Sequence, residues 1–179
     1  MDAVKREEPY TIDDIFALPD GERAELIDGK IYYMSPPSWD HQKIITMLLQ
    51  TIANYIDEHN GNCEVLPAPF AVFLNKDKTN YVEPDISVIC DRSKLDKKGC
   101  HGAPDWVIEI VSPSSRSMDY LIKATKYHDA GVKEYWIVDP EDKLITVYCF
   151  EGEMTVMHYR FGEEIPVGIY EGFSIKLPH

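Results

Sequence analysis

The 179-residue sequence has no apolar run long enough to cross a membrane, which takes about 20 residues. Its purely apolar stretches are only a few residues long, such as Trp106-Val107-Ile108. The first eight residues are rich in charge and lack the apolar core of a secretory signal. We therefore expect a cytoplasmic protein that makes no contact with a membrane.

Cysteine is scarce, and the sequence contains no C-x-x-C pair. Cys100-His101 has no second pair at the spacing that a zinc site requires, which argues against zinc. The wide spacing favours reduced cysteines in an intracellular chain, with Cys90 and Cys149 as small core residues of strands.

Positive charge is also scarce. The chain has 18 Lys and Arg against 31 Asp and Glu, a net charge of −13. Because nucleic-acid affinity comes largely from neutralised phosphates, this balance disfavours a polyanionic partner without excluding one. Basic residues gather in two stretches, 92–98 and 116–133. For any single one of them, a solvated surface position is the simpler interpretation.

Several catalytic motifs are absent. There is no G-x-S-x-G elbow, no glycine-rich phosphate loop and no H-E-x-x-H, which disfavours the hydrolase, nucleotide-binding and zinc-protease classes that use them. No repeat, low-complexity tract or linker divides the chain. We expect a flexible segment over residues 1–9 and a single domain over 10–179.

The first half of the chain predicts a hairpin, a helix and an edge strand. Asp28-Gly29 lies between two strand-like runs and predicts a tight β-hairpin. Apolar residues recur at helical spacing after Ser38, as far as Ile56. Pro67 and Pro69 interrupt a strand-like run over 65–74, which suits either the edge of a sheet or a bend.

The second half predicts a mixed sheet. Residues 85–90 and 105–111 are almost continuously apolar, as expected of strands covered on both faces. A helix over 117–131 and a strand over 135–138 suggest a parallel crossover. The runs at 144–150 and 154–161 suggest antiparallel strands. The fold class is therefore α/β (α+β): a mixed central β-sheet flanked by helices, with an N-terminal β-hairpin.

Two acidic residues stand out on the apolar strands. Asp85 begins one strand, and Glu109 lies inside another. A carboxylate among apolar neighbours costs several kcal/mol unless it has a partner. Neighbouring strands could bring the two together as the oxygen site that Mg²⁺ prefers. Strand alternation equally allows Glu109 to point to a polar face of the sheet.

Two further elements carry charged residues of interest. Glu25 lies on the first strand of the hairpin, where a surface position is the simpler interpretation. Asp119, Lys123 and Tyr127 fall at i, i+4 and i+8 and share one helix face. The alternative for this stripe is a helix ion pair worth a few tenths of a kcal/mol.

Five short motifs follow one another along the chain: Glu25-Leu26-Ile27-Asp28-Gly29, Pro84-Asp85, Glu109-Ile110-Val111-Ser112-Pro113, Asp119-x-x-x-Lys123-x-x-x-Tyr127, and Gly131-Val132-Lys133-Glu134-Tyr135-Trp136. In this order they resemble the Uma-type family of endonucleases, part of the restriction-endonuclease-like PD-(D/E)xK superfamily. Each motif is weak alone, but the order is specific, and the resemblance runs from about Tyr10 to the C-terminus.

The resemblance implies a role for each matching residue. Asp85 and Glu109 would bind a metal, together with the backbone carbonyl of Ile110, and Glu25 would ligate metal or orient water. Val111 stands where the superfamily has its lysine, and Lys123 from the following helix takes that place. The implied active site is Glu25, Asp85, Glu109 and Lys123.

The resemblance also implies an activity: hydrolysis of phosphodiester bonds in nucleic acid, DNA in the first place, with Mg²⁺ or Mn²⁺ and with a homodimer as a possible assembly. Tyr127 could contact a phosphate, and His41 recurs in the family's pattern. Core packing for Tyr127, and packing or capping for His41, are the alternatives. A non-catalytic nucleic-acid- or protein-binding module that retains the fold is the alternative function.

Overall fold

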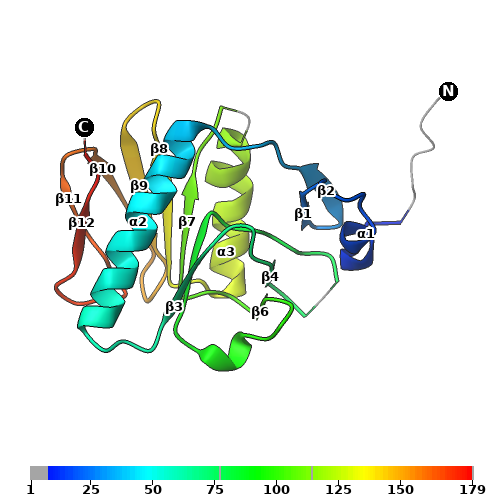
Figure 1. Ribbon diagram of the computed structural model, residues 1–179, viewed down its shortest axis with the longest axis horizontal. Helices are drawn as coiled ribbons and strands as arrows, with labels where there is room; N and C mark the ends of the chain where they lie inside the picture. The colour runs from blue at the N-terminus through cyan, green and yellow to red at the C-terminus, as the bar shows by residue number, and fades with distance from the viewer. Residues whose placement is uncertain (1–7, 77, 114, 179) are drawn as a thin grey trace.

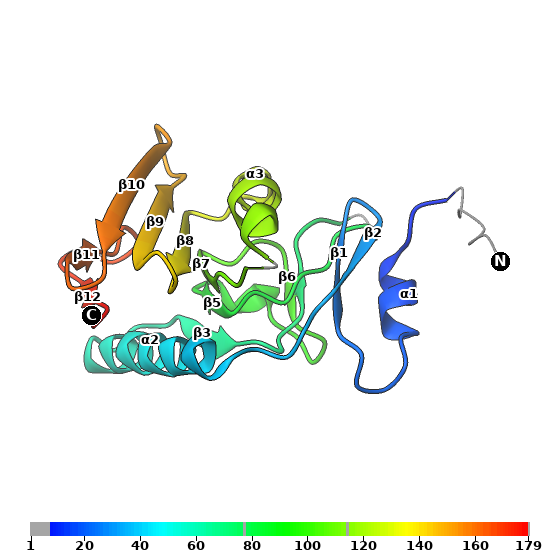
Figure 2. The same cartoon turned by 90° about the horizontal axis from the view of Figure 1, so that it is seen from above.

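A six-stranded sheet lies at the centre of the computed structural model, which describes residues 8–76, 78–113 and 115–178. Helix α2 (Trp39–Glu58) covers one face and α3 (Ala124–Ala130) the other (Figure 1 and Figure 2). The predicted mixed α/β architecture is confirmed. The strand order is β10 (Thr155–Arg160), β9 (Leu144–Cys149), β8 (Glu134–Asp139), β7 (Trp106–Ile110), β5 (Ile86–Ile89) and β3 (Glu64–Pro67).

The crossover from β7 to β8 carries the second helical layer. These two strands are parallel, and the other neighbours in the sheet are antiparallel. The helix expected over 117–131 forms, but its first part is a π-helix, η2 (Met118–Lys123), and α3 follows it directly. Gly131 ends the helix with φ +94°, a conformation that glycine adopts without strain.

Alternation along β7 divides its side chains between two cores. Trp106, Ile108 and Ile110 pack in the cluster that includes α2, whereas Val107 lies in the cluster that includes α3. Glu109 shares the second face, because side chains two apart on a strand point the same way. Helical residues cover that face, so the alternative in which Glu109 points to a polar face is wrong.

The N-terminal hairpin lies beside the main sheet (Figure 2). Strands β1 (Ala24–Ile27) and β2 (Lys30–Tyr33) pair antiparallel, and Asp28 and Gly29 both have positive φ, as the Asp-Gly sequence predicts. Leu26 exchanges backbone hydrogen bonds of 2.7 and 2.8 Å with Tyr81, which fixes β1 against the segment before Asp85. Helix α1 (Ile12–Phe16) packs on β1. Residues 1–7 of the segment expected to be flexible lie outside the described residues.

Short elements complete the structure. Strand β3, which ends at Pro67, is an edge strand, one of the two positions that the prolines suit, and the run expected over 65–74 is divided between β3 and β4 (Val72–Phe73). Strand β4 pairs with β6 (Cys100–His101), and β11 (Glu164–Pro166) pairs with β12 (Ser174–Lys176). A 3₁₀ turn, η1 (Arg92–Lys94), follows β5. Within the described residues, no helix is both long and apolar enough to span a membrane.

The cysteines differ from the expectation. Cys63 and Cys90 form a disulfide, so the prediction that they are reduced is wrong, and Cys90 is not a free core residue. They are 27 residues apart in sequence, but the antiparallel register pairs Glu64 with Ile89 and so places the two cysteines opposite each other. Cys100 and Cys149 are free.

The disulfide leads to a stability prediction. Replacing both Cys63 and Cys90 with serine should lower the free energy of unfolding by about 2–4 kcal/mol, because the cross-link restricts the unfolded chain. Urea denaturation of the oxidised protein measures the change. Dithiothreitol should lower the stability of the wild type to that of the double variant and leave the variant unchanged. A wild type insensitive to reductant would contradict the cross-link.

Candidate active site

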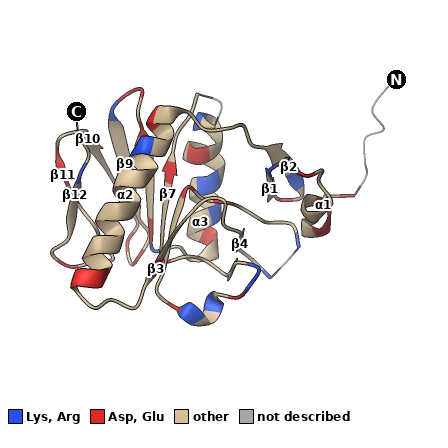
Figure 3. Ribbon diagram, in the orientation of Figure 1, with Lys and Arg blue, Asp and Glu red and all other residues tan. Residues whose placement is uncertain are grey.

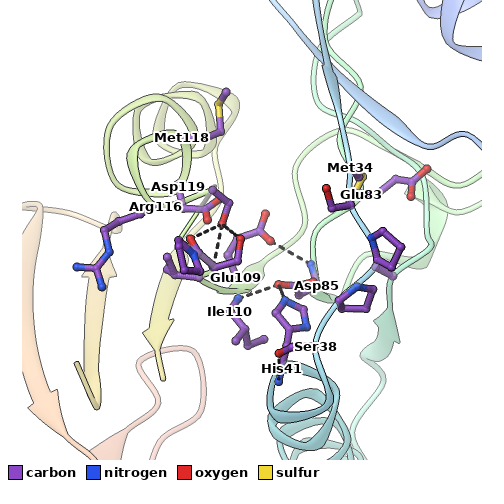
Figure 4. Close-up of a pocket in the computed structure, with 18 of the residues that line it drawn as sticks. Met34, Ser38, His41, Glu83, Asp85, Glu109, Ile110, Arg116, Met118 and Asp119 are labelled. Carbon is purple, nitrogen blue, oxygen red and sulfur yellow. Dashed lines mark hydrogen bonds and ion pairs between the residues drawn. The ribbon is translucent and has the colours of Figure 1, made fainter. Parts of the chain in front are cut away.

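A cleft of about 830 Å³ opens where the hairpin, the start of α2 and one end of the main sheet meet (Figure 4). Strand β5 runs antiparallel to β7, and the pairing of Ile86 with Ile108 places Asp85 beside Glu109 at this end. The cleft is lined by all four residues that the sequence singles out, and also by Asp119 and His41.

Asp85 and Glu109 are joined through the backbone. The Asp85 N–H donates to Glu109 Oε2 at 3.2 Å, and the Ile110 N–H donates to Asp85 Oδ2 at 2.8 Å (Figure 4). These reciprocal hydrogen bonds fix the two carboxylates at one point of the cleft. The ends of β5 and β7 thus supply the acid pair.

Lys123 lies at the centre of the acidic cluster. Its Nζ is 2.8 Å from Glu25 Oε2, 2.9 Å from Glu109 Oε1 and 3.7 Å from Asp119 Oδ1. The four side chains are between 3% and 6% exposed, so this is a buried ion cluster and not a solvated helix pair. Three carboxylates around one ammonium leave the cluster short of positive charge.

Burial and charge shift the pKa values in this cluster. Burial raises the pKa of Glu109 to about 8 and that of Asp119 to about 6, against the opposing pull of Lys123. Burial alone would lower the pKa of Lys123, but the carboxylates of Glu109 and Glu25 outweigh it and raise that pKa well above its ordinary value. Lys123 therefore stays charged, and its single positive charge is shared by the carboxyl groups around it.

Tyr127 fixes the second acid. Its hydroxyl donates to Glu109 Oε1 at 2.7 Å, and its ring packs edge-on against Tyr135 with centroids 4.8 Å apart. Burial, followed by the charge of Glu109, raises the pKa of Tyr127 well above its usual range, which keeps the hydroxyl a donor. The residue combines core packing with a contact to Glu109, and its hydroxyl is already engaged there.

His41 reaches the other acid from the first turn of α2. Its Nε2 lies 3.2 Å from Asp85 Oδ2, and its backbone N–H donates to the N-cap Ser38 at 3.2 Å. Burial lowers the pKa of His41, but the hydrogen bond with Asp85, the charge of that carboxylate and the backbone of Ile110 together outweigh burial and raise the pKa. Ser38 is the capping residue of α2, and the His41 side chain is a partner of Asp85.

Two contributors were missed in the sequence. The spacing of Asp119 and Lys123 predicts no more than an ordinary helix ion pair, yet Asp119 is 2% exposed. Glu83, next to the P-D motif, accepts from Arg23 Nε at 2.9 Å and from the Tyr81 hydroxyl at 2.7 Å, and its N–H donates to Glu25 Oε1 at 3.0 Å. Glu83 thereby orients Glu25. The repeat at 119, 123 and 127 could have indicated Asp119, but no local signal marks Glu83.

The donor set suits a magnesium-type ion. No group of three or more His, Cys, Asp or Glu forms a metal cage within the described ranges. Mg²⁺ does not need one, because it keeps several waters and binds through one or two carboxylates. Asp85, Glu109 and the Ile110 carbonyl offer hard oxygen atoms, and the surplus of acid over Lys123 would be offset by a divalent charge.

Removing the charge of Lys123 should lower the free energy of unfolding more than removing the charge of Lys126. Lys123→Met should lower the free energy of unfolding by about 3–5 kcal/mol, because it leaves buried carboxylates without a counter-charge. Lys126→Met is the matched control: it breaks a more exposed pair with Asp28 and should cost less than about 1 kcal/mol. Urea denaturation in chelator tests both, and equal losses would argue against a buried cluster.

Comparison with known proteins agrees with the fold and the motifs. Residues 12–178 match the model of the Uma2 family, described as "Putative restriction endonuclease". "Uncharacterized protein slr1290" of Synechocystis sp. is 27% identical over 147 residues, covering 80% of this chain and 76% of that protein. A crystal structure from Anabaena variabilis, titled as that of "a putative nuclease belonging to DUF820", shares the fold with a TM-score of 0.72, at 24% identity and over 90% of each chain. The resemblance found in the motifs is confirmed, and the chain belongs to the Uma2 family.

Proposed function

We propose that this chain is a metal-dependent endonuclease that hydrolyses phosphodiester bonds, with DNA as its substrate, through Glu25, Asp85, Glu109 and Lys123. The observation that carries the proposal is Lys123, held between Glu25 and Glu109 beside Asp85 in a cleft. Apolar residues of similar volume are often as stable as buried ions or more so, so stability alone does not account for this cluster. Chemistry on a phosphate does.

Asp85, Glu109 and the Ile110 carbonyl would hold Mg²⁺ or Mn²⁺. When bound, a divalent cation polarises a phosphate and lowers the pKa of a bound water. The remaining work falls to the protein. His41 holds the Asp85 carboxylate from one side, and Tyr127 holds Glu109 from the other. Both acids are therefore fixed before any substrate arrives.

Lys123 would stabilise charge in the transition state. Glu25 and Glu109 occupy two of the three donor directions of its ammonium at 2.8–3.0 Å, while Asp119 is farther away at 3.7 Å. The third direction can meet a phosphate oxygen on which negative charge develops. Glu25 would position the ammonium or a water beside it. The lysine arrives from η2, and this explains how Val111 can replace the lysine of the superfamily's usual position.

Metal binding can be tested without cleavage. Mg²⁺ at about ten times its Kd should raise the wild-type Tm by about 3–5 °C, because a ligand that binds only the folded state stabilises it. Asp85→Asn and Glu109→Gln should each remove most of that shift. Asp40→Asn removes an equal charge from the same cleft and should leave it intact. An unchanged shift in both active-site variants would place the metal elsewhere.

Cleavage is the decisive test of the activity. The wild type should cut DNA with Mg²⁺ or Mn²⁺ but not with Ca²⁺ or chelator, because Ca²⁺ is larger and more flexibly coordinated. Asp85→Asn and Glu109→Gln should each slow cleavage by about 100-fold or more. Gel assays on DNA substrates measure the rates, with Asp40→Asn as the control.

Two results would overturn the assignment. Cleavage that persists in both carboxylate variants would indicate a contaminant or a different site. DNA binding without cleavage in any metal would instead support the non-catalytic module, the alternative that the net charge of −13 favours.

A further inference from the structure

A second hollow, of about 360 Å³, adjoins the active-site cleft. Ala68 lines the cleft and Pro69 lines the hollow, while Glu83 lines both. The two depressions are therefore separated by one short segment and one side chain. Lys97 and Lys98 lie on the rim of this second depression, which we call the lysine hollow.

The lysines are carried on a fixed turn. The Asp96 N–H donates to the Gly99 carbonyl at 3.0 Å, and Asp96 Oδ1 accepts from the backbone N–H groups of Lys98 and Gly99. Gly99 has φ +146°, and a Cβ there would lie 2.2 Å from the Ala71 carbonyl oxygen, so only glycine allows this approach. The turn is thereby held against the segment that leads away from Pro69.

Lys97 and Lys98 differ from the other basic residues of the two stretches. Both are exposed, and neither forms an ion pair with any residue in the described part of the chain. Lysines of the second stretch form ion pairs within the chain: Lys126 pairs with Asp28, and Lys133 pairs with Asp105. In the first, Arg92 pairs with Glu64, while Lys94 is half-buried and donates to the Ala103 carbonyl at 2.8 Å. Figure 3 shows basic ribbon at η1 and the turns beside it.

The acids near the lysine hollow are already engaged. Asp96 pairs with His101 at 3.1 Å in addition to its backbone contacts. Glu83, on the wall shared with the cleft, is neutralised by Arg23. A polyanion leaving the cleft would therefore pass a neutralised pair and reach two unpaired ammonium groups. This complementarity is local, and it is compatible with the chain's net charge of −13.

We propose that the lysine hollow binds backbone phosphates of the DNA strand whose scissile phosphate lies in the neighbouring cleft. The inference rests on the proposed function and adds a substrate-binding surface to it. Acidic residues in the cleft suit a metal but repel the substrate, so the affinity must come from another surface. Each ammonium–phosphate contact releases counterions, which makes binding sensitive to salt.

Fluorescence anisotropy of a short DNA duplex in chelator, over a range of salt concentrations, tests the lysine hollow. Lys97→Ala with Lys98→Ala should weaken binding about tenfold at low salt and reduce the slope of log K against log salt by about 2. Arg160→Ala with Lys176→Ala removes two exposed cations from β10 and β12, away from both depressions, and should leave the slope unchanged.

The outcomes separate this inference from the proposed function. The lysine hollow would be overturned if both double variants lost DNA affinity equally, or if the Lys97/Lys98 variant lost none. A wild type that binds no DNA would also overturn it. Equal competition by polyglutamate would also overturn it, in favour of an acidic protein partner. If the salt slope of DNA binding depends on the two lysines but the protein cleaves no DNA with any metal, the proposed role of the lysine hollow stands and the nuclease proposal is wrong. In an active enzyme, the double variant Lys97→Ala with Lys98→Ala should raise the half-saturating DNA concentration about tenfold and leave kcat unchanged.

Discussion

The contacts of Lys123 join parts of the chain that lie far apart in the sequence. Its ammonium lies between Glu25 of the hairpin and Glu109 of the main sheet, and Asp119 of η2 completes the surroundings. Desolvating such ions costs several kcal/mol each, so the cluster is stable only while all its members are in register. The position of the hairpin, the π-helical turn and the crossover therefore depend on one another.

The same constraint shapes the rest of the cleft. Glu83 fixes Glu25 through its backbone N–H, and Tyr127 fixes Glu109 through its hydroxyl. The antiparallel pairing of β5 and β7 then brings Asp85 to the acid pair, while His41 reaches it from α2. Side chains from β1, β7, α2, α3 and the start of β5 therefore meet at this end of the sheet. The disulfide between Cys63 and Cys90 adds a covalent link at the far end of β5 from Asp85.

Charge is divided between two neighbouring surfaces. The cleft concentrates carboxylates, which a metal requires, and the lysine hollow presents the unpaired ammonium groups that a phosphate chain requires. Net charge conceals this division because it averages over the whole surface, on which several other cations, such as Arg92, Lys126 and Lys133, are paired with acids. In the proposed nuclease, catalysis and DNA affinity would therefore depend on separate residues and could be altered independently.

The amino-acid sequence by itself determined what depends on neighbouring residues. The Asp28-Gly29 turn, the apolar period of α2, the edge position of β3 and the order of the five motifs all follow from local conformational preference and spacing. From these, the mixed sheet and the four residues of the proposed site could be predicted. Only the tertiary structure decided the Cys63–Cys90 bond, the surroundings of Asp119 and the adjacency of the lysine hollow to the cleft. These depend on strand register and on contacts between residues as many as 98 positions apart, and no local pattern encodes such distances.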